Sequence, residues 1–300
     1  PEEIPCASSF QQVSEITKLS MLDRVLSERL ESKAFVVNQI LVRNNNDWEE
    51  TAYQVLAKNF GFHVNADPFL QLAQNLPYKT IMKHSDKPIQ IEALLFGQAG
   101  FLEKSEGDEY INILKREYDL LGKKYRLNEG RLNKAQWKFL RLRPANFPTI
   151  RLAQFANLLF CRKNLFSNMV EASLDMKWKT FFSLQQSDYW LRHYQFNKQT
   201  EEKIPVLGQM SKDNLVINSL VPLLVAYGKS KDDQMLVDRA ITILQHVKSE
   251  ANTITRTWAS LQLKSKSAFD SQAMIELHNN YCLKHRCLDC MIGASLIKPI

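Results

Sequence analysis

The chain has 300 residues, of which 45% are hydrophobic and 24% are charged, and it contains only nine glycines and ten prolines. This composition is typical of a folded globular protein, and it argues against a disordered chain and against a turn-rich β architecture. The formal net charge of +7 weakly favours polyanionic partners, because net charge governs non-specific association rather than fold.

The sequence predicts no membrane-spanning helix and no membrane partner, because no apolar run of about 18 residues occurs. The five cysteines are an odd number, and three of them lie between residues 282 and 290. This pattern is typical of a reducing compartment rather than of a secreted disulfide framework, and it predicts a cytoplasmic location. The sequence starts at Pro1 without a methionine, so we expect a fragment or a processed product.

The N-terminal part of the sequence predicts amphipathic helices. Apolar residues spaced mostly three, four or seven apart predict a long helix over 17–43. Asp47 and Glu50 predict a capping box at the start of the next helix, and Gly61 predicts its end. Further helices are expected over 67–77 and 108–125.

Residues 89–102 predict an almost wholly apolar and therefore central helix. Gly97 and Gly100 within it permit close approach of a neighbouring helix. Glu92 is an acid on this apolar helix and needs a buried partner. We expect that partner to be an arginine from the segment around Pro144.

The C-terminal part continues the helical pattern after a stiff break at 144–148. Thr149 is expected to cap a helix that extends to residue 163, and Pro222 is expected to kink a buried helix. No alternating run is long enough for a good strand. Additional helices are predicted over 165–173, 177–185, 213–228, 231–245, 249–263 and 270–285.

The predicted fold is therefore all-α: a multi-helix globular array with irregular loops and no substantial sheet. The usual helix length implies about twelve to fifteen helices. We expect an N-terminal helical subdomain over 1–130 and a C-terminal helical subdomain with a Cys-rich tail over 131–300, packed as one unit.

The Cys-rich tail predicts a structural metal site. Cys287 and Cys290 form a CxxC hook, Cys282 can supply a third sulfur, and a closed zinc or iron–sulfur site needs four ligands. Cys6 is the preferred fourth ligand because it would join the first and last segments. Basic neighbours are expected to lower the pKa values of the thiols. The alternative is a packed helix end with unrelated thiols and no metal, and the other candidate fourth ligands are Cys161, His278 and His285.

A second candidate site is basic. Lys138, Arg141, Arg143 and Arg151 flank the stiff turn, and arginine suits bidentate contacts to the phosphates of nucleic acid. Neighbouring aromatic residues could stack on bases. The alternative is that the arginines pair with carboxylates and that the aromatic side chains belong to the core. The acids considered are Glu92 and Glu117, and the aromatic residues are Trp137, Phe139 and Phe147.

No catalytic residues are predicted. The sequence contains no Gly-rich phosphate loop, no HExxH motif and no nucleophile elbow. His193 lies beside Trp190 in an aromatic segment, where a lone histidine is more often a core residue than a catalyst.

Motifs spread over nearly the whole chain resemble those of one bacterial family, common in Bacteroidetes, whose function is unassigned. The resemblance implies that family members are longer, so that this chain is their C-terminal helical part and any activity lies in an additional N-terminal region similar to restriction-type nuclease folds. One cysteine near residue 6 and three at the end are similar in outline to iron–sulfur staples of some nucleases, although the spacing differs. The motifs lie at 4–6, 28–33, 46–50, 90–100, 141–148, 189–190, 193–194, 217–218 and 282–293.

The leading hypothesis from sequence is a non-catalytic, nucleic-acid-associated helical module of a larger bacterial protein with a Cys-based structural metal site. The alternative is a protein-interaction or scaffold module that binds neither nucleic acid nor metal. The sequence leaves the oligomeric state open.

Overall fold

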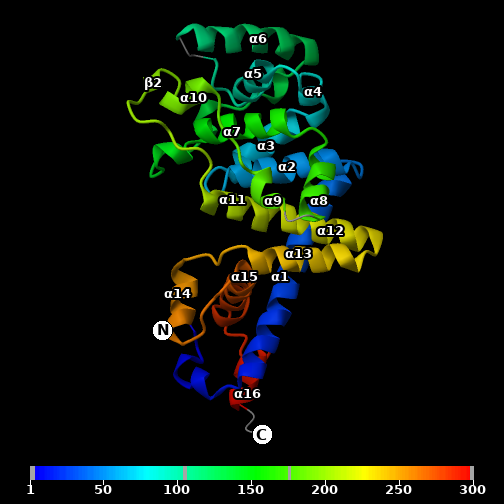
Figure 1. Cartoon of the computed structure of the whole chain (residues 1–300), viewed down its shortest axis with the longest axis vertical. Coiled ribbons are helices and arrows are strands. Elements are labelled where there is room, and N and C mark those ends of the chain that lie inside the picture. Colours follow the sequence, from blue (N-terminus) through cyan, green and yellow to red (C-terminus); the bar gives the residue numbers. More distant parts are fainter. Residues whose placement is uncertain (1–3, 104–106, 175–176, 298–300) are drawn as a thin grey trace. The chain divides into compact units, whose positions relative to one another are not determined.

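The computed structural model describes residues 4–103, 107–174 and 177–297 and shows an all-α protein (Figure 1). The described residues form sixteen α-helices, α1 to α16, together with short 3₁₀ and π segments and one two-stranded hairpin. The predicted fold class is confirmed. This number exceeds the range of about twelve to fifteen helices expected from the usual helix length, because three of the helices have only four or five residues. These are α4 (Tyr78–Met82), α9 (Trp178–Phe181) and α10 (Asp188–Arg192).

The described residues fall into two compact units. The first comprises the chain up to Asn38 together with the chain from Val221 onward, and the second is Gln39–Leu220. Helix α1 (Glu15–Arg43) contributes residues to both. The division near residue 130 expected from sequence lies inside the second unit and stays a prediction.

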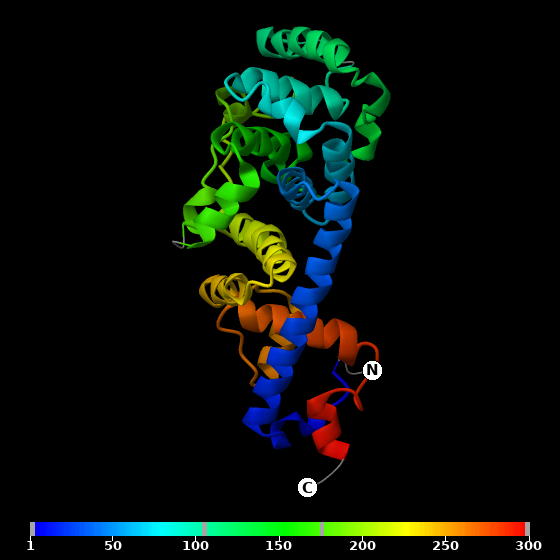
Figure 2. The ribbon, with the colours of Figure 1, turned by 90° about the vertical axis from the view of Figure 1, so that its right-hand side faces the viewer.

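Helix α5 (Pro88–Gln98) is central to the second unit, as predicted. Every residue from Ile91 to Gln98 is buried, and α5 packs against α6 and α7. Both views show α5 and α6 side by side (Figures 1 and 2). The other helices of this unit are α2 (Trp48–Phe60), α3 (Ala66–Asn75), α6 (Glu109–Tyr125), α7 (Pro148–Cys161), α8 (Leu165–Leu174) and α11 (Gln209–Leu215).

Two glycines determine how α5 packs and where it ends. A Cβ on Gly97 would lie 2.1 Å from the Tyr118 ring of α6, so only glycine permits this helix contact. Gly100 has φ +79°, and a Cβ there would lie 2.1 Å from the Leu132 carbonyl oxygen. The helix therefore ends before Gly100 rather than at residue 102.

Local capping starts several helices where the sequence predicts them. Asp47 accepts hydrogen bonds from the backbone nitrogens of Glu49 and Glu50 at 3.0 and 3.1 Å, at the start of α2. The side chain of Glu50 does not complete a box, because it accepts from the Tyr78 backbone nitrogen at 2.8 Å. A tertiary contact has thus replaced the local one.

The aromatic segment after α10 continues into the hairpin of β1 (His193–Gln195) and β2 (Lys198–Gln199). Asn197 lies between the strands with φ +59°. Trp190 is fully buried and stacks on Phe96 of α5 with ring centroids 4.8 Å apart. The hairpin and its preceding helix are therefore held onto the central helix by aromatic packing.

The first unit is a smaller helical assembly. Helix α12 packs against α13, and α15 packs against α13 and α14. The sequence predicts one kinked helix over 213–228. The structure instead has α11, then a π segment over Val216–Leu220 and then α12. The regular helical hydrogen bonding is interrupted because Pro222 lacks a backbone N–H. The elements are η1 (Ala7–Gln12), α12 (Val221–Lys231), α13 (Gln234–His246), α14 (Thr253–Ser260), α15 (Ala268–Leu277), the π segment η6 (His278–Cys282) and α16 (Met291–Ile297).

Among the described helices, none combines the length and the apolar character that crossing a lipid bilayer requires.

Candidate functional site

The basic segment before α7 exposes three of its four predicted cations. Lys138, Arg141 and Arg143 are exposed, and no described residue forms an ion pair with any of them. Leu142 donates its backbone N–H to the Phe139 carbonyl at 3.2 Å and closes a tight turn around Arg141. Arg141 has φ +63°, a backbone state that costs free energy for a residue with a Cβ.

This segment is anchored by a side chain from another part of the second unit. Asn65 donates to the Lys138 carbonyl at 3.0 Å and accepts from the Lys138 backbone nitrogen at 2.8 Å. Trp137 is buried, and its Nε1 donates to the Ala99 carbonyl at 2.9 Å. Trp137 is therefore a core residue, as the alternative interpretation held, and its ring is not accessible to a base. Phe139 and Phe147 pack edge-on against each other with centroids 5.1 Å apart.

Arg151 differs from the other three because it is buried, with 5% of its surface exposed. Its Nη1 donates to Gln154 at 2.8 Å, and its Nη2 donates to Asn146 at 2.6 Å and to Ser211 at 3.1 Å. Its Nε is buried and has no hydrogen-bond partner among the described residues. Thr149, expected to cap α7, instead donates its hydroxyl to the Tyr194 carbonyl, and the cap position is Phe147.

No described carboxylate lies against the Arg151 guanidinium. Burial lowers the pKa of Arg151 to about 10, and no charged neighbour offsets this effect. The guanidinium carbon lies 4.5 Å from the ring centroid of Phe62, which is held at φ +50°. The two acids expected to pair with the arginines have other partners. Glu117 accepts a hydrogen bond from Gln90 at 2.8 Å, and Glu92 accepts one from Tyr110.

A pocket of about 220 Å³ opens beside Arg151 in the second unit. Its lining includes the apolar residues Phe60 and Phe62 and the polar residues Asn65, Arg151 and Ser211. The sequence analysis found Arg151 but missed the pocket, because its walls come from segments separated by about 150 residues in the chain.

Glu92 is buried on α5, as predicted, but the prediction that it pairs with an arginine is wrong. Tyr110 donates its hydroxyl to Glu92 at 2.7 Å, and Trp190 Nε1 donates to the Tyr110 oxygen at 2.8 Å. Burial is the main cause that raises the pKa of Glu92, while the Tyr110 hydrogen bond opposes it. The carboxyl group is thus stabilised by neutral donors rather than by an ion pair.

His193 contributes to the same aromatic cluster. Its ring stacks on Tyr189 with centroids 3.9 Å apart, and its Nδ1 lies 2.9 Å from the Tyr189 carbonyl oxygen. This packing agrees with the interpretation of His193 as a core residue rather than a catalyst.

The structure brings the predicted metal-ligating cysteines into one neighbourhood of the first unit. The segment η1, which follows Cys6, packs against α16, which follows Cys290. Burial raises the pKa of Cys6 to about 11, with further repulsion from Cys290 and Cys287. Burial also raises the pKa of Cys282 to about 12, and electrostatic repulsion from Cys6 is the next largest cause of this rise. Cys6 and the three C-terminal thiols therefore influence one another's ionisation.

The C-terminal cysteines lie on a tightly packed turn. A Cβ on Gly293 would lie 2.4 Å from the Cys287 carbonyl oxygen. The expected lowering of thiol pKa values by basic neighbours is wrong for Cys282 and Cys290, because burial dominates. In this arrangement no three His, Cys, Asp or Glu side chains of the described residues converge tightly enough to enclose a metal ion.

The alternative fourth ligands are placed differently. Cys161 is exposed on α7 in the second unit, and His285 is exposed with φ +52°. His278 is buried, its Nδ1 lies 3.0 Å from Asn279 Oδ1, and its Nε2 has no described partner.

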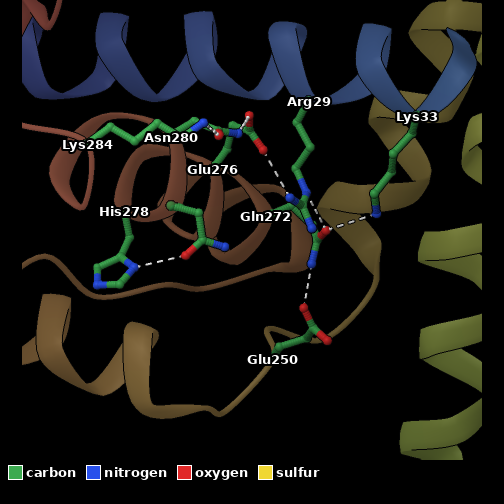
Figure 3. A network of polar contacts seen from close by, with 9 residues as sticks. Arg29, Lys33, Glu250, Gln272, Glu276, His278, Asn280 and Lys284 are labelled. Atoms are coloured by element: carbon green, nitrogen blue, oxygen red, sulfur yellow. Dashed lines mark hydrogen bonds and ion pairs between the residues drawn. The ribbon is translucent and has the colours of Figure 1, made fainter. Parts of the chain in front are cut away.

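A polar network in the first unit escaped the sequence analysis (Figure 3). Arg29 Nε donates to Gln272 at 2.8 Å and Arg29 Nη1 lies 3.0 Å from Glu276, while Lys33 donates to Gln272 at 3.3 Å. Burial lowers the pKa of Lys33 to about 7; repulsion by Arg29 adds to this effect, whereas Glu250 and Glu276 oppose it. The residues are about 240 positions apart in sequence, so helical periodicity alone could not pair them.

Comparison with known proteins identifies a family but no characterised relative. No curated protein and no solved structure matches the chain. Residues 1–253 match DUF2851, described as a protein of unknown function. The match includes the basic segment, the Arg151 pocket residues and Cys6, whereas the three C-terminal cysteines lie beyond it. Because the match covers most of the sequence, the chain belongs to the DUF2851 family.

Proposed function

We propose that this chain is a non-catalytic helical module of a larger bacterial protein that binds nucleic acid through phosphate contacts. The observation that carries the proposal is the exposed basic segment. Lys138, Arg141 and Arg143 lie on a short stretch of backbone, without acid partners among the described residues. Exposed, unpaired cations bind phosphates at little desolvation cost and release counterions.

The anchoring of this segment supports a binding role. Asn65 fixes the Lys138 backbone through two hydrogen bonds, and the turn holds Arg141 in a left-handed conformation. A preorganised set of cations loses less conformational entropy on binding than three flexible side chains would.

The experiment is a titration of a fluorescently labelled duplex oligonucleotide, followed by anisotropy at several salt concentrations. We expect the logarithm of the binding constant to fall with the logarithm of salt concentration, each phosphate contact contributing about −0.9 to the slope. Replacing Lys138, Arg141 and Arg143 together with Gln should make the slope less negative by about 2 to 3.

A matched variant removes the same charge elsewhere in the second unit. Arg116, Lys123 and Arg126 are exposed on or just after α6, and their replacement with Gln should leave most of the slope unchanged. Equal losses in both triple variants would show that only net charge matters. A complex insensitive to salt, or no complex, would favour the protein-interaction or scaffold alternative.

We further propose that Cys6, Cys282, Cys287 and Cys290 form a structural site for zinc or an iron–sulfur cluster. The proposal is supported by the packing of η1 on α16 and by the close packing of Gly293 against Cys287 in the CxxC turn. A bound metal would hold the four sulfurs as thiolates and offset the cost of burying them.

A further inference from the structure

Three residues at the Arg151 pocket carry hydrogen-bond donors without a partner among the described residues. Arg151 Nε–H has no partner, and neither the Asn146 amide nitrogen nor the Ser211 hydroxyl donates to another described residue. These three groups come from α7, the 3₁₀ turn before it and α11, so they approach from different directions. Arg151 Nε–H is buried, whereas Asn146 is exposed and Ser211 is half-buried. Buried donors are normally satisfied, so the unpaired Nε–H beside two further free donors indicates a ligand that supplies acceptors.

The charge of the pocket also indicates a bound ligand. The guanidinium of Arg151 is held by neutral groups, namely Gln154, Asn146 and Ser211. A buried cation without a counter-charge is costly, and buried charges in proteins are usually paired. A bound anion would supply the missing counter-charge.

The backbone around the pocket is strained where the guanidinium is positioned. Phe62 has φ +50° and places its ring over Arg151. Gly61 is required before it, because a Cβ there would lie 2.2 Å from the Asn65 carbonyl oxygen. Strain of this kind persists where the surrounding structure enforces it, and it is frequent at ligand sites.

We propose that this pocket binds the phosphate group of a phosphate monoester, with Arg151, Asn146 and Ser211 as its donors. A tetrahedral phosphate has enough oxygens to accept from donors in several directions, whereas a planar carboxylate has two. The volume of about 220 Å³ is below the roughly 300–1,000 Å³ typical of pockets for whole small ligands. The pocket therefore fits an anionic head group with a short apolar neighbour, and the remainder of the ligand extends into solvent.

The pocket lining contains none of the exposed cations of the basic segment, so phosphate binding here does not depend on the nucleic-acid binding proposed for them. The monoester has two possible sources: the 5′-phosphate at a nucleic-acid end, or a small phosphorylated metabolite. Both present the same dianion to Arg151.

The test is calorimetric titration of the intact chain with inorganic phosphate at constant ionic strength. We expect saturable binding with about one site per chain, as one pocket implies. Arg151→Gln should weaken binding about tenfold or more, because it removes the charge and charge-assisted hydrogen bonds. Arg162→Gln is the matched control, because this arginine also lies over an aromatic ring, Phe181, at 5.5 Å, and it should bind phosphate as the wild type does.

A second variant protects the test against misfolding of Arg151→Gln. Ser211→Ala removes one donor and retains the guanidinium, so it should weaken phosphate binding several-fold while circular dichroism shows native helix content. Absence of saturable binding in the wild type, or equal affinity in wild type, Arg151→Gln and Ser211→Ala, would overturn the proposal.

Two further ligands distinguish the sources. A 5′-phosphorylated dinucleotide is compared with the same dinucleotide bearing a 5′-hydroxyl, and with glycerol phosphate. Tighter binding of the phosphorylated dinucleotide than of glycerol phosphate assigns the site to a nucleic-acid end, and the reverse order assigns it to a metabolite. If the hydroxyl dinucleotide binds as well as the phosphorylated one and glycerol phosphate does not bind, the monoester proposal is wrong.

Discussion

The guanidinium carbon of Arg151 lies 4.5 Å from the ring centroid of Phe62, in the place where a buried arginine ordinarily has a carboxylate. The electron-rich ring face offsets part of the cost of burying the cation. It does not supply a full negative charge, so Arg151 remains a buried cation supported by neutral groups.

Replacing Phe62 with Leu should therefore lower the free energy of unfolding by about 0.5–2 kcal/mol through loss of the cation–π contact. Leucine retains a side chain at the same positive φ, so the backbone strain is unchanged. Urea denaturation is the measurement, and Phe62→Tyr, which keeps a ring, is the control. Equal stability of the Leu variant and the wild type would mean that the ring does not support the cation.

The cysteine proposal predicts joint changes in metal content and thermal stability. Protein purified without chelator or added metal should contain about one zinc per chain, or absorb near about 400 nm under anaerobic conditions if it holds an iron–sulfur cluster. Cys6→Ser and Cys287→Ser should each lower the metal content and the Tm together, because either leaves the site open.

Cys161→Ser is the control for that experiment, because Cys161 is exposed and lies in the other unit. A metal-free wild type, or Cys6→Ser protein with full metal content, would contradict the four-cysteine site.

The raised pKa of Glu92 predicts a pH-dependent stability. A carboxyl whose pKa is higher in the folded state binds more protons folded than unfolded. Wild-type stability should therefore fall as the pH rises from about the usual value of 4.5 through the raised pKa. Glu92→Gln should remove this fall and still accept the hydrogen bond from Tyr110.

The measurement for Glu92 is the free energy of unfolding at several pH values between about 4 and 8, a range that covers the usual and the raised pKa values of a carboxyl group. Tyr110→Phe is the contrasting variant: it should cost about 1–3 kcal/mol, because it leaves Glu92 and the Trp190 nitrogen without their partner. An unchanged pH dependence in Glu92→Gln would show that other groups cause it.

Lys33 predicts the opposite pH dependence. Its folded pKa of about 7 is lower than its usual 10.5, so between these values the unfolded chain binds more protons and stability should rise with pH. Lys33→Met should reduce this slope, by at most about 1.4 kcal/mol per pH unit for one proton. Unfolding at pH values across this window is the measurement.

Lys284→Met is the matched lysine variant in the same network. Lys284 is exposed and donates to Asn280 at 2.6 Å, so its replacement should leave the slope as it is. A parallel curve for Lys33→Met and wild type would mean that the Lys33 ammonium stays protonated in the folded protein.

The sequence by itself determined the helical class and many helix starts, because these depend on neighbouring residues. Asp47 and Asp108 accept hydrogen bonds from backbone amides only two or three residues away. The apolar run around Glu92 made a central helix predictable, and Gly97 indicated the close contact with its neighbour.

Only the tertiary structure decided what each charged or reactive side chain meets. Arg143 and Arg151 lie eight positions apart, yet one is exposed and the other buried. The partner of Glu92 proved to be Tyr110 rather than an arginine, and Gln272 binds Lys33 across 239 positions. Helix formation follows from local backbone geometry, whereas burial, pairing and pocket formation depend on which distant segments the chain brings together.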